Sequence, residues 1–124
     1  MTPFPFQTEM LVVTPREVYA YYDVPRLFSA VDGLGKLWLV HWVDEHEIGE
    51  GGQDDWLCVR ITEERLAKVE SGEIDLHDAL RRAVDGNGIY VESPWPKGAD
   101  RARVVDLDGL DPGLFCEPGV TLKD

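Results

Sequence analysis

The chain has 124 residues, of which 44% are hydrophobic, and this size suits one globular domain with its own apolar core. Its 24 Asp and Glu residues outnumber its 12 Lys and Arg residues, which gives a formal net charge of -12. Such a charge disfavours binding to nucleic-acid phosphates and to anionic membrane surfaces, and it favours a basic protein partner. We therefore expect a single domain over residues 1–124 that binds neither nucleic acid nor membrane.

The two cysteines, Cys58 and Cys116, are too few for a disulfide framework and show no metal-ligand spacing. We interpret them as free thiols in a reducing cytoplasm. The first ten residues lack a basic segment followed by an apolar one, and no apolar run reaches membrane-spanning length. These features predict a cytoplasmic protein without a standard export signal.

The start of the chain carries prolines at positions 3, 5 and 15, which predict an extended arm over residues 1–15. Within this arm, residues 10–13 are expected to pair as an edge strand. Residues rich in β-branched and aromatic side chains follow, with turn signals at residues 23–25 and 32–35. They predict an antiparallel meander of about four strands, over residues 17–22, 26–31, 36–43 and 56–61.

Helical signals follow the meander. Thr62 is a good N-cap and Gly72 a helix stop, while Asp75 caps a second helix that is expected to end at Gly86. One or two short strands are expected afterwards, over residues 89–91 and 103–107. The whole pattern predicts an α+β fold, in which a mainly antiparallel sheet carries two helices on one face. Residues 16–92 are expected to form its core.

Alternation along the third and fourth predicted strands gives the sheet two apolar faces. One face is aliphatic and suits the two helices. The other carries Trp38, Trp42 and Trp56, and it needs a cover of its own, because burying one such ring stabilises a protein by about 1.5–3 kcal/mol. We expect the C-terminal tail, residues 93–124, to cover this second face. The alternative is that the face forms an interface with a second copy or with another protein.

Six carboxylates and no Lys or Arg lie between the third and fourth predicted strands. They are Asp44, Glu45, Glu47, Glu50, Asp54 and Asp55. An acidic loop held out beside an aromatic sheet predicts a docking surface for a basic partner, and we assign Trp38, Trp42 and Trp56 to the same surface. A solvated hairpin tip is the plain alternative, because charged runs beside glycine are ordinary in loops.

His41, Asp44 and His46 allow a second hypothesis. Histidines and carboxylates can bind a divalent metal or transfer protons, so these residues, with Asp23, could serve a small metal-dependent hydrolase. However, their spacing matches no metal motif, and the chain contains neither a nucleophile elbow nor a phosphate-binding loop. We therefore assign no cofactor, no metal ligand and no catalytic residue from the sequence.

Two short motifs carry a resemblance to a known family. The run Tyr21-Tyr-Asp-Val-Pro-Arg-Leu-Phe28 gives a Tyr-Asp-x-Pro-x-Leu-Phe hairpin, and Gly72-Glu-Ile-Asp-Leu76 gives a Gly-x-Ile-x-Leu entry into the second helix. With these motifs, residues 17–92 resemble a bacterial domain family of unknown function. The resemblance implies the same α+β architecture and a bacterial cytoplasm, and it implies no activity and no site residues.

Three functional hypotheses follow. The first is a small acidic, non-enzymatic interaction module, similar in kind to the immunity proteins, antitoxins and enzyme inhibitors that dock on basic surfaces. The second is the metal-dependent hydrolase. The third is a structural homo-oligomer that uses the Trp face and has no ligand site. The charge balance favours the first.

Overall fold

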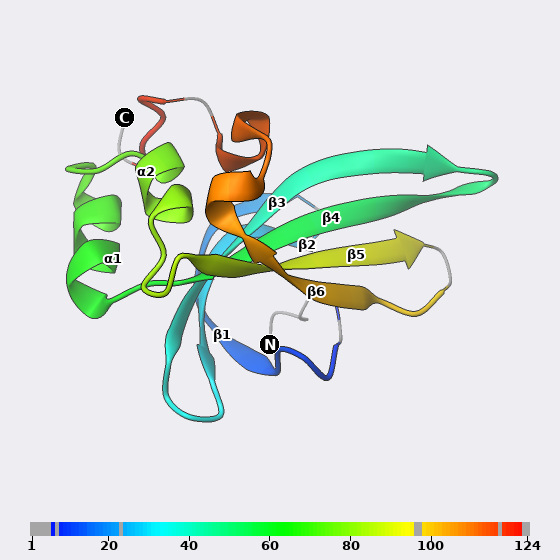
Figure 1. Cartoon of the computed structure of the whole chain (residues 1–124), viewed down its shortest axis with the longest axis horizontal. Coiled ribbons are helices and arrows are strands. Elements are labelled where there is room, and N and C mark those ends of the chain that lie inside the picture. Colours follow the sequence, from blue (N-terminus) through cyan, green and yellow to red (C-terminus); the bar gives the residue numbers. More distant parts are fainter. Residues whose placement is uncertain (1–5, 7, 23, 96–97, 117, 123–124) are drawn as a thin grey trace.

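The computed structural model describes residues 6, 8–22, 24–95, 98–116 and 118–122. Its strands form one sheet in which each strand pairs antiparallel with the next along the chain (Figure 1). The strands are β1 (Val13–Tyr22), β2 (Val24–Asp32), β3 (Leu37–Ile48), β4 (Gly51–Arg60), β5 (Asn87–Trp95) and β6 (Arg101–Asp106). The helices are α1 (Glu63–Ser71) and α2 (Leu76–Arg81), followed after β6 by the short 3-10 helices η1 (Leu107–Gly109) and η2 (Pro112–Phe115).

The predicted α+β class with a mainly antiparallel sheet is confirmed, although the meander has six full strands rather than about four with short additions. The expected arm is also shorter, because β1 already begins at Val13. At the predicted turn over residues 23–25, Tyr22 of β1 pairs with Val24 of β2, so the two strands form a hairpin at this position. Asp23 lies outside the described residues.

The acidic segment is not a loop, which corrects the sequence interpretation. β3 continues to Ile48 and β4 begins at Gly51, so only Gly49 and Glu50 form the turn between them. Gly49 adopts a positive φ of 58° that suits this tight reversal. Gly52 is needed for another reason, since a Cβ at this position would collide with the ring of Trp95 on the neighbouring strand. The glycines that suggested a loop therefore permit a long two-stranded ribbon.

The two helices begin where their capping residues predict. The Thr62 side chain accepts a hydrogen bond from the backbone N–H of Arg65, and Asp75 accepts one from the N–H of Asp78. Gly72 ends α1 in the left-handed conformation, with φ of 84°. The second helix is shorter than expected, because it ends at Arg81 and not near Gly86.

One face of the sheet, which we call the helix side, packs against α1, α2 and both 3-10 helices. Leu57 and Val59 from β4 meet Val69 from α1 and Leu80 from α2, and all four are fully buried. Leu107 and Phe115 belong to the same core. The C-terminal tail therefore packs on the helix side, and its predicted place on the Trp face is wrong. The tail follows β6 directly around the sheet edge to the helices (Figure 1).

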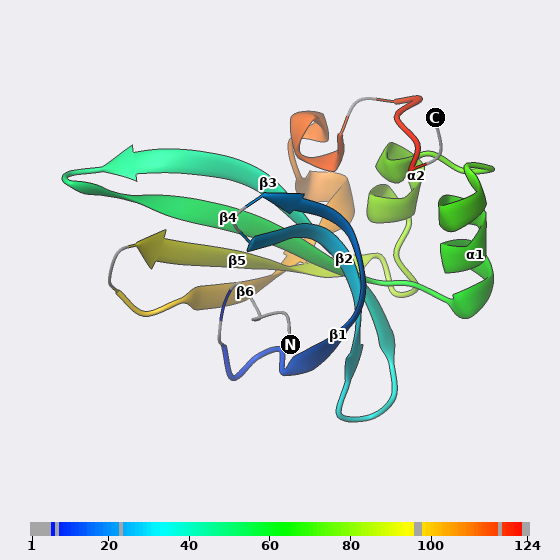
Figure 2. The same cartoon turned by 180° about the vertical axis from the view of Figure 1, so that it is seen from behind.

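The opposite face, which we call the Trp side, forms a second core around Phe28, Trp38 and Trp56. Its cover comes from the start of the chain, where Phe6 and Leu11 are 3% and 5% exposed. Figure 2 shows this N-terminal segment passing beneath the curved sheet before it enters β1. The face is therefore covered within the chain, as one alternative held, but by the arm rather than the tail.

A β-bulge at Val43 divides β3 into two parts. Trp42 pairs with Trp56 and Asp44 pairs with Asp55, so Val43 has no partner of its own on β4. Before the bulge, Leu39 and His41 face the helix side. After it, the alternation is shifted by one residue, and His46 faces the same side, where it contacts Asp55.

Candidate functional site

The acidic ribbon, residues 44–55, extends beyond the helices at one end of the molecule (Figure 1). It carries all six carboxylates of the predicted site, but in different environments. Asp44, Glu45, Glu47 and Glu50 are exposed, whereas Asp54 is half-buried and Asp55 is only 4% exposed. Four of the six are therefore available to a partner, while Asp54 and Asp55 serve contacts inside the ribbon.

The ribbon places like charges opposite one another. Asp44 pairs with Asp55, and Glu45 pairs with Asp54 on the neighbouring strand. Like charges at directly opposed positions of antiparallel strands are destabilising. Two consecutive pairs of this kind destabilise the ribbon in its observed register. The polar contacts on its two faces must therefore offset the repulsion.

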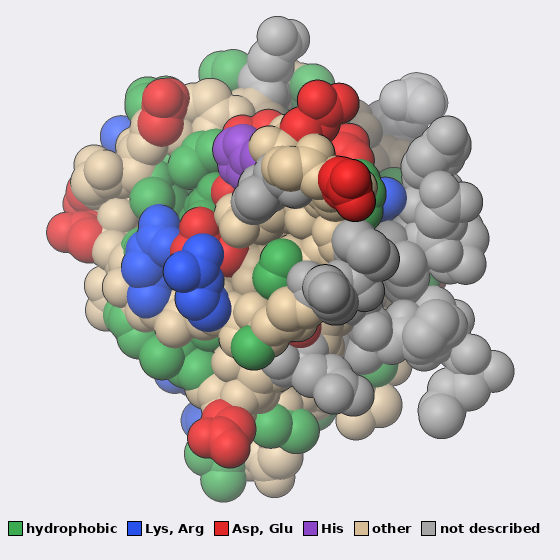
Figure 3. Space-filling model, turned by 90° about the vertical axis from the view of Figure 1, so that its right-hand side faces the viewer, with side chains coloured by type: hydrophobic (Ala, Val, Ile, Leu, Met, Phe, Trp, Pro, Cys, Tyr) green, Lys and Arg blue, Asp and Glu red, His purple; other side chains and the backbone are tan. Residues whose placement is uncertain are grey.

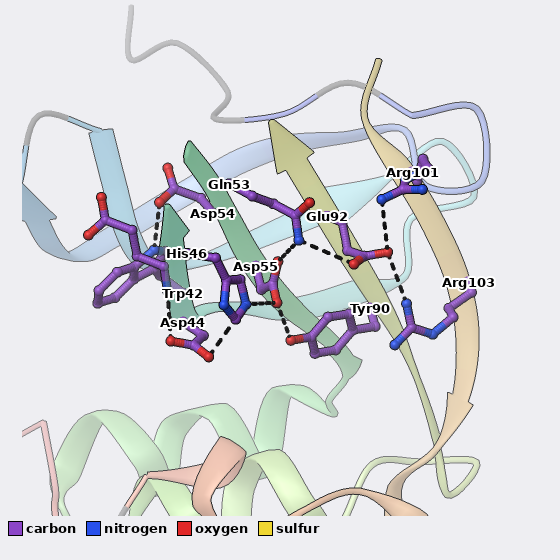
Figure 4. A network of polar contacts seen from close by, with 11 residues as sticks. Trp42, Asp44, His46, Gln53, Asp54, Asp55, Tyr90, Glu92, Arg101 and Arg103 are labelled. Atoms are coloured by element: carbon purple, nitrogen blue, oxygen red, sulfur yellow. Dashed lines mark hydrogen bonds and ion pairs between the residues drawn. The ribbon is translucent and has the colours of Figure 1, made fainter. Parts of the chain in front are cut away.

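On the helix side, Asp55 is the centre of a polar network (Figure 4). Its Oδ2 accepts a hydrogen bond from the hydroxyl of Tyr90 at 2.6 Å and lies 2.9 Å from Nε2 of His46. Its Oδ1 accepts a hydrogen bond from Nε2 of Gln53 at 2.8 Å. These contacts come from β3, β4 and β5, so three strands converge on one buried carboxylate. Three hydrogen-bonding partners satisfy its oxygens away from water.

His46 lies between two carboxylates. Besides Asp55, its Nε2 lies 3.5 Å from Oδ2 of Asp44. The hydrogen bond with Asp55 and the charges of Asp55, Asp44 and Glu92 raise the pKa of His46, against a smaller opposing effect of burial. A raised pKa favours the imidazolium, which compensates the Asp44–Asp55 repulsion. The imidazole bridges the two opposed carboxylates and so helps to hold the two strands of the ribbon together.

The network continues toward the sheet edge. The Nε2 of Gln53 also donates to Glu92 at 3.2 Å, and Glu92 forms ion pairs with Arg101 and Arg103 of β6. The Arg103 guanidinium lies over the Tyr90 ring, 4.8 Å from its centroid. Figure 3 looks onto this end of the molecule and shows acidic side chains around a histidine, with a patch of basic side chains beside them. The surface thus combines an acidic ribbon with a neighbouring basic edge.

On the Trp side of the ribbon, Asp54 is held by two other residues. Its Oδ1 accepts a hydrogen bond from Nε1 of Trp42 at 3.1 Å and lies 3.7 Å from the Arg26 guanidinium. That guanidinium stacks over the Trp42 ring at 4.8 Å. Arg26 on β2 therefore faces the second acidic pair, as His46 faces the first.

The prediction that the three tryptophans share the partner surface is wrong. Trp38 and Trp56 are 9% and 1% exposed, because the N-terminal arm covers them. Trp42 is half-buried beneath Arg26. A partner at the ribbon would meet the four exposed carboxylates and the exposed His46, with Trp42 only partly accessible.

The hypothesis of a metal site gains no support from the geometry. His41 lies on the helix side, where its Nε2 is 3.2 Å from Sγ of Cys116, while His46 contacts Asp44 and Asp55. Burial lowers the pKa of His41 to about 4. Within the described ranges, no three His, Cys, Asp or Glu side chains converge in an arrangement that could hold a metal ion. Asp23, the remaining candidate of that hypothesis, lies outside those ranges.

Both cysteines carry free thiols. Cys58 is fully buried on β4, and burial raises its thiol pKa. Burial also raises the pKa of Cys116, with a further contribution from the charge of Asp75. Neither environment favours the thiolate that a nucleophile requires.

Sequence reasoning missed the residues that stabilise the ribbon, namely Arg26, Gln53, Tyr90 and Glu92. A signal for one of them was present, since Gln53 lies two residues before Asp55 and so shares its face once both are placed on a strand. The others lie 28 to 39 positions away from the ribbon residues they contact, and only the pairing of β2 and β5 with the central ribbon brings them there.

Comparison with known proteins gives one result. A model described as a family of unknown function (DUF6575) matches residues 7–113, which includes every strand and both α-helices. The expected resemblance to an uncharacterised family is confirmed, and the match extends beyond residues 17–92 on both sides. No curated protein and no solved structure matches the chain. None of the helices in the described part of the chain is long and apolar enough to cross a membrane.

Proposed function

Because the chain belongs to this family of unknown function, DUF6575, we propose its function from the site alone: it is an interaction module that docks a basic protein partner on the acidic ribbon. One observation carries the proposal. Asp44, Glu45, Glu47 and Glu50 are exposed on a ribbon that extends beyond the helices, and two of them oppose other carboxylates across the strands.

The physical argument starts from the cost of this arrangement. Opposed carboxylates destabilise a sheet, yet here they occur at two successive positions, one faced by His46 and the other by Arg26. Local conflicts of this kind are typical of functional sites, where stability is sacrificed for another purpose. Lys or Arg side chains of a partner would relieve the repulsion and would be attracted by the overall charge.

The proposed surface differs from the predicted one. It keeps Asp44, Glu45, Glu47 and Glu50, and it assigns Asp54 and Asp55 to the internal support of the ribbon. The buried Trp38 and Trp56 are removed from it. The reason for proposing a homodimer through the Trp face also disappears, because the arm occupies that face.

A charge-reversal experiment tests the proposal. Glu45, Glu47 and Glu50 are replaced by Lys together, and the tagged protein is used for affinity capture from its native host at low salt, with quantitative mass spectrometry of the proteins that high salt releases. We expect one basic protein to be captured by the wild type and lost with the variant. Salt should release it, because exposed charges are screened over about 8–10 Å at physiological ionic strength.

A matched control separates the ribbon from net charge. Replacing Glu64, Glu73 and Asp108 by Lys changes the formal charge equally but alters exposed positions outside the ribbon. This variant should retain the partner. Equal capture by all three proteins, or equal loss from both variants, would refute a specific role for the ribbon. Circular dichroism establishes that both variants fold.

A further inference from the structure

The N-terminal arm is held on the Trp side by two side chains. Phe6 packs on Trp56 with their ring centroids 5.7 Å apart, and Leu11 joins the same buried cluster. Between these anchors Glu9 and Met10 are exposed, so this part of the arm contributes little to the core. The arm is therefore a short irregular segment with a bend at Glu9 and Met10, seated on an aromatic face by two apolar anchors.

The face beneath the arm contains an unpaired hydrogen-bond donor. Trp56 is 1% exposed, and none of the described residues accepts a hydrogen bond from its Nε1. Trp38 and Trp42 differ, since their indole N–H groups donate to Asp32 at 2.9 Å and to Asp54 at 3.1 Å. A buried donor without an acceptor costs about 1–3 kcal/mol, so native proteins rarely leave one. An oxygen acceptor placed at Trp56 Nε1 would therefore stabilise this face.

A groove beside the arm reaches this face from solvent. It has a volume of about 570 Å³ and lies between arm residues Thr8, Glu9 and Met10 and the chain that leads into β6. One of its lining residues, Ala102, packs against the Trp-side core. The groove therefore gives an approaching chain a route to the edge of the covered face.

We propose that the Trp side beneath the arm is a peptide-binding site and that the arm is its resident occupant. An extended segment of a partner protein replaces the arm, with an aromatic side chain in the place of Phe6. A backbone carbonyl of that segment accepts the hydrogen bond from Trp56 Nε1. This is a site on the Trp side of the sheet, and it stands whether or not the acidic ribbon binds a basic partner.

Two observations indicate that the ligand of this face is a peptide and not a small apolar carboxylic acid. The face already holds a short chain segment through Phe6 and Leu11, and every residue of a peptide carries a carbonyl acceptor. The formal net charge of -12 opposes a carboxylate ligand, whereas a neutral or basic segment meets no such barrier. The arm must leave the face before the partner segment can bind. Molecules in which the arm is seated therefore lower the apparent affinity of the protein for that segment.

The test uses the full-length chain with Phe6→Ala and Leu11→Ala, which releases the arm. The probe is a capped peptide with the sequence of residues 6–11 but with Lys in place of Glu9, and its control has Ala in place of Phe6. Binding is followed by the indole N–H resonance of Trp56 in NMR spectra, assigned by loss of that resonance in Trp56→Phe. We expect a saturable shift of this resonance with the first peptide and binding at least about tenfold weaker with the control.

Comparison with the wild type tests the role of the arm. The peptide should bind the released variant about tenfold more tightly than the wild type, whose arm competes with it. If the folded variant shows no shift of the Trp56 resonance at millimolar peptide, the proposal is wrong. It is also wrong if both proteins bind equally. Should the double variant not fold, Phe6→Leu in the full chain replaces it under the same criteria.

A second comparison tests the hydrogen bond itself. In the released background, Trp56→Phe keeps an aromatic ring but removes the N–H, and it should weaken peptide binding about tenfold, in keeping with the value of one buried hydrogen bond. Because this variant lacks the Trp56 resonance, the affinities in this comparison are measured by isothermal titration calorimetry. Trp38→Phe is the matched control, because its N–H already donates to Asp32. If both substitutions weaken binding equally, the peptide carbonyl does not accept a hydrogen bond from Trp56 and this part of the proposal is wrong.

Discussion

The two ends of the hairpin formed by β3 and β4 lie in different surroundings. At its base, Leu39 and Leu57 lie in the helix-side core, while Val40 and Cys58 lie in the Trp-side core, and all four are fully buried. Beyond the bulge, the same two strands carry six carboxylates with polar contacts on both faces. The base stabilises the fold, whereas the tip, where like charges oppose one another, is the part to which we assign the proposed binding.

Two histidines of β3 show the same difference between the base and the tip. His41 lies at the base near Cys116, and burial lowers its pKa to about 4. His46 lies at the tip beside Asp55 and Asp44, which raise its pKa. Five residues along one strand thus separate an imidazole whose pKa is lowered by burial from one whose pKa is raised by neighbouring carboxylates.

The largest expected effect comes from the base. Leu57→Ala removes a fully buried side chain from the helix-side core and should lower the free energy of unfolding by about 2–5 kcal/mol. Glu47→Ala, at an exposed position of the tip, should change it by less than about 0.5 kcal/mol. Urea denaturation of both variants measures the difference, and similar losses would contradict the contrast between base and tip.

The second prediction concerns His41 and acid. Its folded-state pKa lies below the ordinary value, so the unfolded chain binds more protons, and stability falls as pH drops from about 6.5 to about 4. The shift corresponds to about 3 kcal/mol for this group. Urea denaturation of wild type and His41→Gln across this range should show a shallower loss for the variant. Parallel curves would mean that His41 is not held neutral by burial.

A smaller effect is expected where base and tip meet. Tyr90→Phe removes the hydroxyl that donates to the buried Asp55 at 2.6 Å. Loss of one hydrogen bond to a buried charged group should lower the free energy of unfolding by about 1.5–3 kcal/mol, measured by urea denaturation at pH 7. Tyr19→Phe also removes a hydroxyl, which contacts the exposed Glu70 at 2.8 Å and Ser29 at 3.4 Å, and it serves as the control. If the two variants lose equal stability, Asp55 does not depend on Tyr90.

The most subtle prediction concerns His46. Its folded-state pKa is raised, so its contribution to stability is complete below the ordinary value and is lost as pH rises through the folded value. NMR titration should place its midpoint above that of a free histidine. Asp55→Asn should lower the midpoint more than Asp44→Asn, because Asp55 is the principal cause. An unchanged midpoint in Asp55→Asn would show that another group holds the proton.

The sequence predicted the helices well because their signals are local. Thr62, Gly72 and Asp75 act on backbone groups within a few residues, and the structure uses each of them as expected. The identity of the two sheet faces was also correct as far as Trp42, because alternation requires only that a strand continue. Beyond that residue, the bulge at Val43 shifts the alternation, and nothing local announced it.

The candidate site was predicted in position but not in form. Six acids near the middle of the chain were sufficient to locate it, while their glycine neighbours suggested a loop where the strands continue. Which acids are buried depended largely on Tyr90 and Arg26, whose contacts with them need the pairing of β5 with β4, and of β2 with β3 and β3 with β4, in one sheet. Sequence composition carries no record of such pairings.

The sequence by itself determined the α+β class, the helix caps, the acidic charge and the need to cover an aromatic face. Only the tertiary structure decided that Phe6 and Leu11 provide this cover while Leu107 and Phe115 join the helices. The physical reason is that hydrophobic burial has no direction: a sequence shows which side chains must leave water, but only the path of the chain decides which of them meet.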